Sequence, residues 1–587
     1  MRNLRTAALA AAGLSGAISV LGWAPFGWWL LPLLTYAMLF RLLGTTRTAW
    51  QAGALGLAFG FGLHLAGHGW VLAALHRQSG LALVPAALAT TAFVCYLALF
   101  TALPCALWRT MVKGGASRLS SGSVFAALTT IAEWSRSLFF NGFTSLSLGY
   151  SLADTPLSGY APVVGVYGLS CLGYGLSAAL ASKRGGLRSS VLMVAAMVAG
   201  GLVLGGIAWV EPDGPALRYR LIQTNVEQHR KFDPRYAGRQ MQRLLGLIEQ
   251  GPADLIVTPE TAFTVALNDL PGDTLSELQR FSRASRSHLL LGIATTSANA
   301  EDHNSVIQIA PDARRIARYD KVRLMPFGEY APAGFAWFSA ALDIPLKDLS
   351  PGLPGQRPLI LGSARIGTLI CHEDLIGRDL RRWLPEASLL INPSNLAWFE
   401  GSLAIGQRLQ IVQMRALESG RPILRVANTG VTALIDHRGR VLERLPEMQQ
   451  ASLSGQVQPM RGMTPYARLG DLPIVAASAA YALLYWLMRR IRALFRAPRS
   501  RPERDVRVIP AAFVRARGRL APPALSARPP ARRRVARRAT PGWRWASTVW
   551  PRPDHRARPN YRCRQRRVAP YRCTAWPGWP GRCRCRG

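Results

Sequence analysis

Eight hydrophobic segments limit what this chain of 587 residues can fold into. A helix needs about 17 to 25 apolar residues to cross a hydrocarbon core of about 30 Å. Most of the segments reach this length, while the second and the eighth are near its lower limit. The sequence therefore predicts a multi-helix membrane domain. The segments cover about residues 5–22, 27–43, 52–75, 81–108, 122–140, 157–182, 189–210 and 472–488.

The positive charges between these segments predict an orientation. Arg and Lys residues lie in the N-terminus and in every second connection, whereas the alternate connections carry only Arg77. Loops rich in Lys and Arg stay on the cytoplasmic side of a membrane. The N-terminus is therefore expected inside, and seven crossings place residues from about 211 onward outside. The eighth segment then returns the chain to the cytoplasmic side at Arg489 and Arg490.

The chain divides into four expected parts. Residues 1–212 would form seven transmembrane helices, 213–468 an extracytoplasmic catalytic domain, and 469–495 the eighth helix. Short β-like runs alternate with helical stretches in the second part, which predicts an α/β domain with a core of its own. The strand candidates are 220–223, 254–257, 289–294, 306–310, 367–371, 388–392, 423–427 and 431–435.

The fourth part, residues 496–587, has an unusual composition. It contains twenty-six arginines, no lysines and three acidic residues, together with many prolines. Such a segment cannot bury enough apolar surface to fold, so it is expected to be disordered. We interpret it as an appendage, or as the product of an out-of-frame reading, rather than as a functional domain. No nucleic-acid partner is expected.

Cys371 is the candidate nucleophile of the α/β domain. It ends an apolar run and is followed by Glu373 and Asp374, while Glu260 and Lys321 follow other β-like runs upstream. A thiol becomes a good nucleophile when a base or a nearby cation makes it a thiolate, and a carboxylate with an ammonium group supplies both. The chain has only five lysines against sixty-six arginines, so a lysine in this pattern is informative. The pattern predicts covalent acyl-transfer chemistry.

This order of Glu, Lys and Cys resembles the nitrilase superfamily, whose members carry such a triad. The resemblance implies a four-layer αββα sandwich, with Glu260 as general base, Lys321 as oxyanion stabiliser and Cys371 as nucleophile. It implies no cofactor and no metal ion.

Three neighbouring residues would support that triad. Glu329 would orient Lys321 or a substrate amine, and the backbone N–H of His372 would help to bind the oxyanion. Glu373 is the third supporting residue, next to the nucleophile.

Four further motifs, with the hydrophobic segments on both sides, narrow the resemblance. Over roughly residues 1–495 the chain resembles the apolipoprotein N-acyltransferases, a membrane-embedded family of the nitrilase superfamily. The resemblance implies that Cys371 takes an acyl chain from a membrane phospholipid as a thioester. The N-terminal amine of the diacylglyceryl-cysteine of an apolipoprotein would then receive it. The motifs are Trp398-Phe399, residues 414–422, residues 428–432 and residues 462–468.

The resemblance also implies a place in the cell. The protein would be a monomeric, multi-pass protein of the bacterial inner membrane, with its catalytic domain on the periplasmic side. Its N-terminus and C-terminal tail would be cytoplasmic. Its partners would be the phospholipid donor, the diacylglyceryl-modified apolipoprotein and the lipid bilayer.

Some positions depart from the family pattern. Phe232 stands where tryptophan is common, and His372 stands where a tyrosine often follows the cysteine. The expected substrate cleft, with Phe232, Trp398 and Phe399, therefore has an uncertain shape, although the triad is intact. His372 is adjacent to the nucleophile, but consecutive side chains of a strand point to opposite faces, which argues against its use as the base.

Other interpretations stay open. A membrane-anchored amidase or hydrolase of the nitrilase type would use the same triad and let water resolve the thioester. The helix count and the segment 465–468 favour transfer. A membrane scaffold or transporter would leave Cys371 dispensable. Within the fifth segment, Glu133 and Arg136 would form either an internal pair or a contact with a phospholipid headgroup, because ionisable groups at that depth need a partner.

Overall fold

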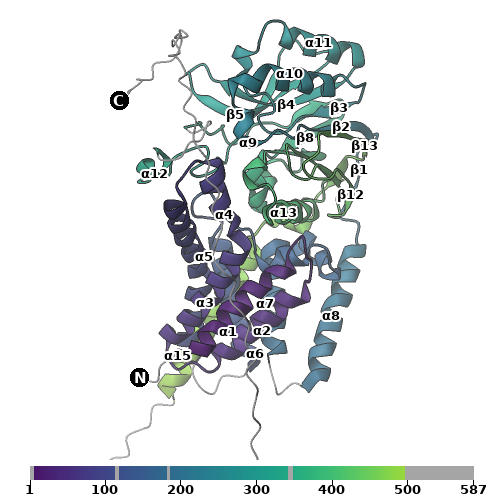
Figure 1. Cartoon of the computed structure of the whole chain (residues 1–587). Coiled ribbons are helices and arrows are strands. Elements are labelled where there is room, and N and C mark those ends of the chain that lie inside the picture. Colours follow the sequence, from purple (N-terminus) through teal and green to yellow (C-terminus); the bar gives the residue numbers. More distant parts are fainter. Residues whose placement is uncertain (1–5, 113–117, 182–185, 341–347, 496–587) are drawn as a thin grey trace, which may run out of the picture. The chain divides into compact units, whose positions relative to one another are not determined.

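A computed structural model describes residues 6–112, 118–181, 186–340 and 348–495. The prediction for the tail, 496–587, lies outside the described residues. Within residues 6–495, a helical region and an α/β domain pack against each other (Figure 1). The last helix, α15 (Leu472–Phe495), follows the α/β domain and packs among the helices of the first region.

Helices occupy all eight hydrophobic segments. Among the described residues, three helical stretches are long and apolar enough to cross a membrane, at Leu83–Met111, Pro156–Leu180 and Leu472–Arg492. A fourth is formed if Ala49–His68 and Trp70–Gln78, which meet at 48°, act as one span. The helical elements are α1 (Thr6–Ser19), η1 (Val20–Gly22), α2 (Leu30–Leu43), α3 (Ala49–His68), α4 (Trp70–Ala73), η2 (Ala74–Gln78), α5 (Leu83–Met111), α6 (Arg118–Ser135), η3 (Leu148–Leu152), η4 (Pro156–Tyr160), α7 (Ala161–Leu180) and α8 (Gly186–Gly206).

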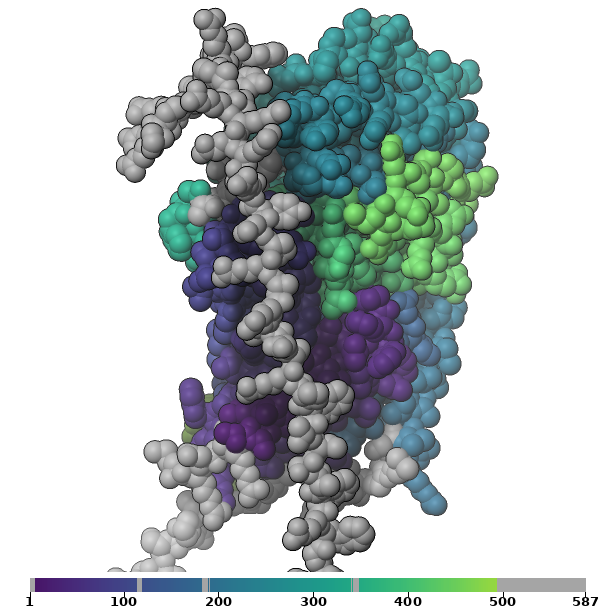
Figure 2. Space-filling model, viewed as in Figure 1, coloured from purple at the N-terminus to yellow at the C-terminus, as the bar shows by residue number. Residues whose placement is uncertain are grey.

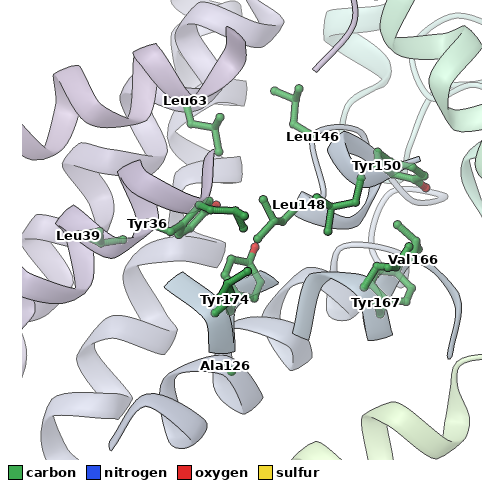
Figure 3. Packing of buried hydrophobic residues seen from close by; sticks show 14 of the residues in the cluster. Tyr36, Leu39, Leu63, Ala126, Leu146, Leu148, Tyr150, Val166, Tyr167 and Tyr174 are labelled. Atoms are coloured by element: carbon green, nitrogen blue, oxygen red, sulfur yellow. The ribbon is translucent and has the colours of Figure 1, made fainter. Parts of the chain in front are cut away.

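The core of the helical region forms around the short segment η3. Leu148 of η3 points toward the rings of Tyr36 and Tyr174, which come from α2 and α7 (Figure 3). Glu133 of α6 accepts hydrogen bonds from Leu148 N at 2.9 Å and from the Tyr174 hydroxyl, while Arg136 Nη2 donates to Ser147 Oγ at 2.8 Å. These protein partners favour the internal pair over a contact with a headgroup.

The α/β domain contains two six-stranded sheets that pack face to face. Their order is β13-β2-β3-β4-β5-β6 in one and β12-β11-β10-β9-β8-β7 in the other. The first sheet is built from β2 (Leu217–Gln223), β3 (Leu255–Val257), β4 (His288–Thr296), β5 (Asp302–Ile309), β6 (Ala317–Asp320) and β13 (Ala451–Val457). The second is built from β7 (Leu359–Leu361), β8 (Ala364–Thr368), β9 (Leu389–Ser394), β10 (Ile423–Ala427), β11 (Ala433–Ile435) and β12 (Val441–Arg444).

Helices cover the outer faces of both sheets. α10 (Pro234–Ile248) and α11 (Thr274–Ser285) pack on the first sheet through an apolar cluster that includes Leu244 and Leu278. α13 (Ala404–Ser419) packs on the second sheet. The domain is therefore the αββα sandwich that the resemblance to the nitrilase superfamily implied (Figure 1). The remaining elements are α9 (Gln228–Lys231), α11's preceding turn η5 (Leu267–Asp269), α12 (Ala336–Ala340), η6 (Cys371–Leu375), η7 (Gly377–Arg382), η8 (Ala397–Phe399), α14 (Pro465–Leu469) and the short pair β1 (Val210–Pro212) and β14 (Met460–Gly462).

Helix α13 is the element shared by the two regions. Val412 and Ala416 face the core of the sheets, whereas Ile411 and Met414 belong to the core of the helical region. Glu418 accepts a hydrogen bond from the backbone N–H of Val166 in α7 at 2.8 Å. Figure 2 shows the α/β domain, in teal and green, in direct contact with the purple and blue helices. α13 therefore packs directly against both the α/β domain and the apolar helices of the first region, which we call the membrane-type helices.

Two glycines allow α1 and α3 to approach closely. A Cβ at Gly16 would lie 1.9 Å from the carbonyl oxygen of Phe59, and one at Gly62 would lie 2.0 Å from that of Gly13. Such backbone contacts are typical of helix pairs in membranes, where small residues permit tight van der Waals packing.

We predict that Gly62→Ala lowers the melting temperature of the purified protein in detergent. The added methyl group would force α1 and α3 apart, and overpacking of this kind costs about 1 to 3 kcal/mol of stability. The matched control is Gly175→Ala in α7, where a Cβ meets no atom within 4 Å. That control should be neutral or slightly stabilising, since Ala is the better helix former. Equal melting temperatures for the two variants would contradict the packing argument.

Candidate active site

The three residues of the predicted triad follow the carboxyl ends of three strands. Glu260 follows β3, Lys321 follows β6, and Cys371 comes three residues after β8. β3 and β6 point the same way in the first sheet, because β3 and β4 are parallel and the next two pairings are antiparallel. Glu260 and Lys321 therefore lie at the same edge of the first sheet, and the charges of both act on Cys371.

Lys321 is an ammonium group buried between two carboxylates. Its side chain is 1% exposed, and Nζ lies 2.9 Å from an oxygen of Glu260 and 2.9 Å from an oxygen of Glu329. Burial acts to lower the pKa of Lys321, but the charges of the two carboxylates outweigh it and raise the pKa above its ordinary value. Lys321 is therefore a permanent cation at neutral pH.

Glu260 is held ionised by its partners. Besides Lys321, it accepts hydrogen bonds from Asn304 Nδ2 at 2.8 Å and from the backbone N–H of Asn395 at 2.8 Å. Burial would raise the pKa of Glu260, but the charge and hydrogen bond of Lys321, with the charge of Lys231 and the amide of Asn304, hold that pKa below its ordinary value. A buried carboxylate of this kind can act as a base.

Glu329 completes the pair of carboxylates. Asn304 Nδ2 also donates to Glu329, at 2.7 Å, and the backbone N–H of Met325 donates to its second oxygen at 2.7 Å. This arrangement agrees with the expectation that Glu329 orients Lys321.

The sequence predicted that Cys371 ends a strand, and this prediction is wrong. β8 stops at Thr368, and Cys371 opens the 3-10 helix η6 with a left-handed φ of 50°. A non-glycine residue with this φ is strained and persists only where its surroundings hold it. Here Arg408 Nη2 and Asn392 Nδ2 donate to the carbonyl oxygen of Cys371 at 2.9 Å and 3.2 Å. The short apolar run up to Cys371 could not reveal this turn.

The thiol of Cys371 is protonated in the resting protein. Burial and then the negative charge of Glu260 raise the pKa of Cys371 to about 12, and the positive charges of Lys321 and Arg408 offset only part of this. Such a thiol must lose its proton as it reacts, so a nucleophilic Cys371 would need a general base.

Glu373 and Asp374 are buried and stabilise the turn at Cys371 through hydrogen bonds and ion pairs. Glu373 accepts hydrogen bonds from the Tyr319 hydroxyl at 2.8 Å and from the backbone N–H of Ile370 at 2.8 Å. The buried Asp374 pairs with Arg408 at 2.5 Å and with Arg425 at 3.4 Å. Both acids therefore act on the position of Cys371.

His372 is buried and neutral. Burial, and then the charge of Lys321, lower its pKa far below the ordinary value. The prediction that His372 lies in a strand is wrong, because residues 371–375 form a 3-10 turn, so strand geometry does not exclude His372 as a base. The suppressed pKa is a better reason, since a histidine that hardly binds a proton is a poor base.

The three aromatic residues expected in the cleft have different surroundings. Trp398 shares an apolar cluster with Leu72, Leu75, Leu81, Ala86, Phe327 and Phe338, so it contacts the membrane-type helices. The ring of Phe399 lies 4.6 Å from that of Trp70, centroid to centroid. Phe232 follows the last residue of α9, and Lys231 Nζ lies 5.7 Å from the centre of its ring.

Sequence reasoning missed three residues of the site. Asn304 and Arg408 lie far from the triad motifs in the chain, and no local pattern marks them. Lys231 is buried beside Glu260, and the scarcity of lysine that made Lys321 informative applied to it equally. Within the described residues, no group of three or more His, Cys, Asp or Glu side chains could hold a metal ion.

We predict that alkylation of Cys371 by iodoacetamide accelerates with pH through about pH 10, because only the thiolate reacts and the folded thiol has a pKa near 12. Mass spectrometry of the Cys371 peptide would give the rate at each pH. Glu260→Gln should move the curve to lower pH, since it removes a negative charge that opposes ionisation. A rate that is already constant from about pH 7 would contradict this protonation state.

Comparison with known proteins agrees with both regions of the structure. Residues 15–180 match the "Apolipoprotein N-acyltransferase N-terminal domain" family, and residues 220–464 match the "Carbon-nitrogen hydrolase" family. An amidase from Nesterenkonia has 18% identity over 45% of this chain and 97% of its own, with a TM-score of 0.33.

Two curated relatives are called apolipoprotein N-acyltransferase. The protein from Ralstonia nicotianae is 38% identical over 501 residues, which is 84% of this chain and 95% of the relative. The protein from Nitrosomonas europaea is 39% identical over 482 residues, 80% of this chain and 95% of the relative. At this identity over nearly the whole length of its relatives, the chain belongs to the apolipoprotein N-acyltransferase family.

Proposed function

We propose that this protein transfers an acyl chain from a membrane phospholipid to the N-terminal amine of the diacylglyceryl-cysteine of an apolipoprotein, and that it does so through a thioester on Cys371. One observation carries the proposal: the buried Glu260–Lys321 pair lies at the strand ends that also present Cys371, in a domain that packs directly on apolar helices. Membership of the family supplies the choice of substrates.

In the first half-reaction, Cys371 Sγ attacks the ester carbonyl of the phospholipid. Glu260 takes the thiol proton as the C–S bond forms, which suits a thiol whose pKa is too high for a resting thiolate. The tetrahedral oxyanion is stabilised by Lys321 Nζ and the backbone N–H of His372. The C–O bond then breaks, Glu260 returns the proton to the leaving alkoxide, and a lysophospholipid departs.

In the second half-reaction, the amine of the lipid-modified cysteine attacks the thioester carbonyl. Glu260 accepts a proton from the amine, and the same two donors stabilise the second oxyanion. The C–S bond breaks, the thiolate regains its proton, and the N-acylated product leaves. The mechanism is therefore ping-pong, with Cys371 as the only covalent carrier.

The apolar surroundings of the site suit lipid substrates. The cluster of Trp398, Phe327 and Phe338 with Leu72, Leu75, Leu81 and Ala86 joins the catalytic loops to helices that would lie in the bilayer. An acyl chain on this route stays in apolar contact, whereas its extraction into water would cost about 0.8 kcal/mol for each CH₂. We propose Phe232, Trp398 and Phe399 as residues of the substrate cleft.

The hydrolase alternative uses the same triad with water in the second step. The family of the relatives does not favour it, and the direct packing of the domain on apolar helices would serve no purpose for a soluble amide. The two interpretations differ only in the acceptor, so an experiment on the acceptor separates them.

We predict that the purified protein, incubated with phospholipid in micelles, gains the mass of one acyl chain on Cys371. A diacylglyceryl-cysteine peptide should discharge this adduct onto its amine. Cys371→Ala should form no adduct, and Lys321→Met should form it about 100- to 1,000-fold more slowly, since one oxyanion donor is worth that much. Discharge only to free fatty acid would establish the hydrolase, and no adduct in folded protein would remove Cys371 as the nucleophile.

We also propose the arrangement in the membrane. The protein lies in the bacterial inner membrane with eight crossings, seven in residues 1–212 and one in 469–495. Residues 213–468 form the catalytic domain on the periplasmic side, and both ends are cytoplasmic. The charge pattern of the connections supports this orientation. We further propose that the protein acts as a monomer and that residues 496–587 are an appendage that catalysis does not need.

The orientation predicts which positions a membrane-impermeant maleimide can reach. Asn299→Cys, in the exposed connection between β4 and β5, should be labelled in intact spheroplasts. Arg47→Cys, between α2 and α3, should be labelled only after the membrane is opened. Mass spectrometry of the two peptides would give the extent of labelling at each cysteine. The reverse pattern would mean that the proposed topology is inverted.

A further inference from the structure

Lys231 is a second buried ammonium group next to the proposed base. It is the last residue of α9, and it is 3% exposed. Its Nζ donates to the backbone carbonyl of Glu260 at 3.0 Å and to Thr261 Oγ1 at 2.7 Å. The side chain therefore contacts two consecutive residues of the turn that carries Glu260.

The turn at Glu260 is strained and closely packed. Thr261 has a left-handed φ of 47°, which costs free energy for a β-branched residue. β4 approaches the turn so closely that a Cβ at Gly292 would lie 2.0 Å from the carbonyl oxygen of Pro259. The two hydrogen bonds of Lys231 hold Glu260 and Thr261 in this conformation. The position of the Glu260 carboxylate thus depends on a turn that packs on Gly292 and is clamped by Lys231.

A neutral hydrogen-bond donor could satisfy the same two acceptors, so the charge of Lys231 needs its own explanation. A buried ammonium is costly unless a negative charge compensates it. Among the residues that the structure describes, Lys231 has no carboxylate within ion-pair distance, and its two hydrogen bonds go to a carbonyl and a hydroxyl. The negative groups that act on it through space are the carboxylate of Glu260 and Cys371. The charge of Lys231 therefore acts mainly on Glu260 and Cys371.

We propose that Lys231 is a positioning residue for the acyl transfer, which clamps the turn of Glu260 and, as a cation, keeps the Glu260 carboxylate ionised beside Cys371. The inference rests on the proposed function, because it assigns Glu260 the role of base.

The electrostatics of the site support the charge effect. Burial lowers the pKa of Lys231 to about 8, so the group is still mainly protonated at neutral pH. Its charge helps to hold the pKa of Glu260 below the ordinary value. The other groups that face Glu260 are the cation Lys321 and, as negative or ionisable groups, Glu329 and Cys371. The remaining two, Asn304 and Asn395, are neutral hydrogen-bond donors to Glu260.

The test is the pH dependence of kcat/KM for transfer from phospholipid to a diacylglyceryl-cysteine peptide, with the full-length protein in micelles. Lys231→Met removes a cation near Glu260, so the pKa of Glu260 rises and the acidic limb moves to higher pH, by about one unit. The plateau rate should fall about 100-fold, because the turn also loses its clamp. Lys231→Arg keeps the charge and should leave the acidic limb in place.

Two further variants separate charge from geometry. Thr261→Val removes one acceptor but leaves the cation, so the plateau rate should fall while the acidic limb stays. Arg230→Gln removes an exposed cation of the same helix and should change neither quantity. If Lys231→Met does not accumulate as folded protein, Lys231→Gln makes the same change of charge.

The outcomes are distinct. An acidic limb that stays in place in Lys231→Met, with a rate within about twofold of wild type, would overturn this inference while wild-type transfer still supports the proposed function. A lower rate with an unmoved limb would reduce Lys231 to a structural residue and also overturn the charge effect. A wild-type protein that forms no Cys371 adduct would instead refute the proposed function itself.

Discussion

The buried ammonium of Lys321, placed between the carboxylates of Glu260 and Glu329, is the interaction on which the rest of the site depends. Charges out of water cost several kcal/mol each unless they are paired and hydrogen-bonded. Lys321 pairs with both acids, and Asn304 donates to both of them as well. Lys231 adds the second positive charge, so two acids and two ammonium groups balance at the strand ends. This balance keeps Glu260 ionised, while burial keeps Cys371 protonated.

Cys371, the candidate nucleophile, is positioned by a separate network on the second sheet. Arg408 of α13 donates to the carbonyl of Cys371 and pairs with Asp374, and Arg425 of β10 pairs with the same acid. Because α13 is buried against the sheet on one face and against the membrane-type helices on the other, the position of Cys371 is tied to both regions. The turn at Cys371 and the apolar cluster around Trp398 are thus both in contact with the helical region.

Much of the α/β domain could be predicted because its central strands are buried on both faces and read as continuous apolar runs, as β9 and β10 do. The four edge strands were not predicted: β6, β12 and β13 carry exposed or polar side chains, and β7 is an apolar run of only three residues. Cys371 was assigned to the end of a strand, since nothing in Leu369-Ile370-Cys371 distinguishes an extended backbone from a 3-10 turn entered through a left-handed residue. Lys231 was overlooked although it directly precedes Phe232, because nothing in the local sequence shows that its side chain is buried beside Glu260.

The sequence by itself determined the eight hydrophobic segments and an α/β domain between the seventh and the eighth, because local patterns of apolarity are written in consecutive residues. The αββα layering and the choice of Glu260, Lys321 and Cys371 as a candidate set came from short motifs that resemble the nitrilase superfamily. Only the tertiary structure decided the protonation of Cys371, the neutrality of His372 and the contacts of Lys231 and Arg408 with the site. Those properties depend on burial and on charges brought together from distant parts of the chain, and no run of adjacent residues encodes a pKa or a contact across two sheets.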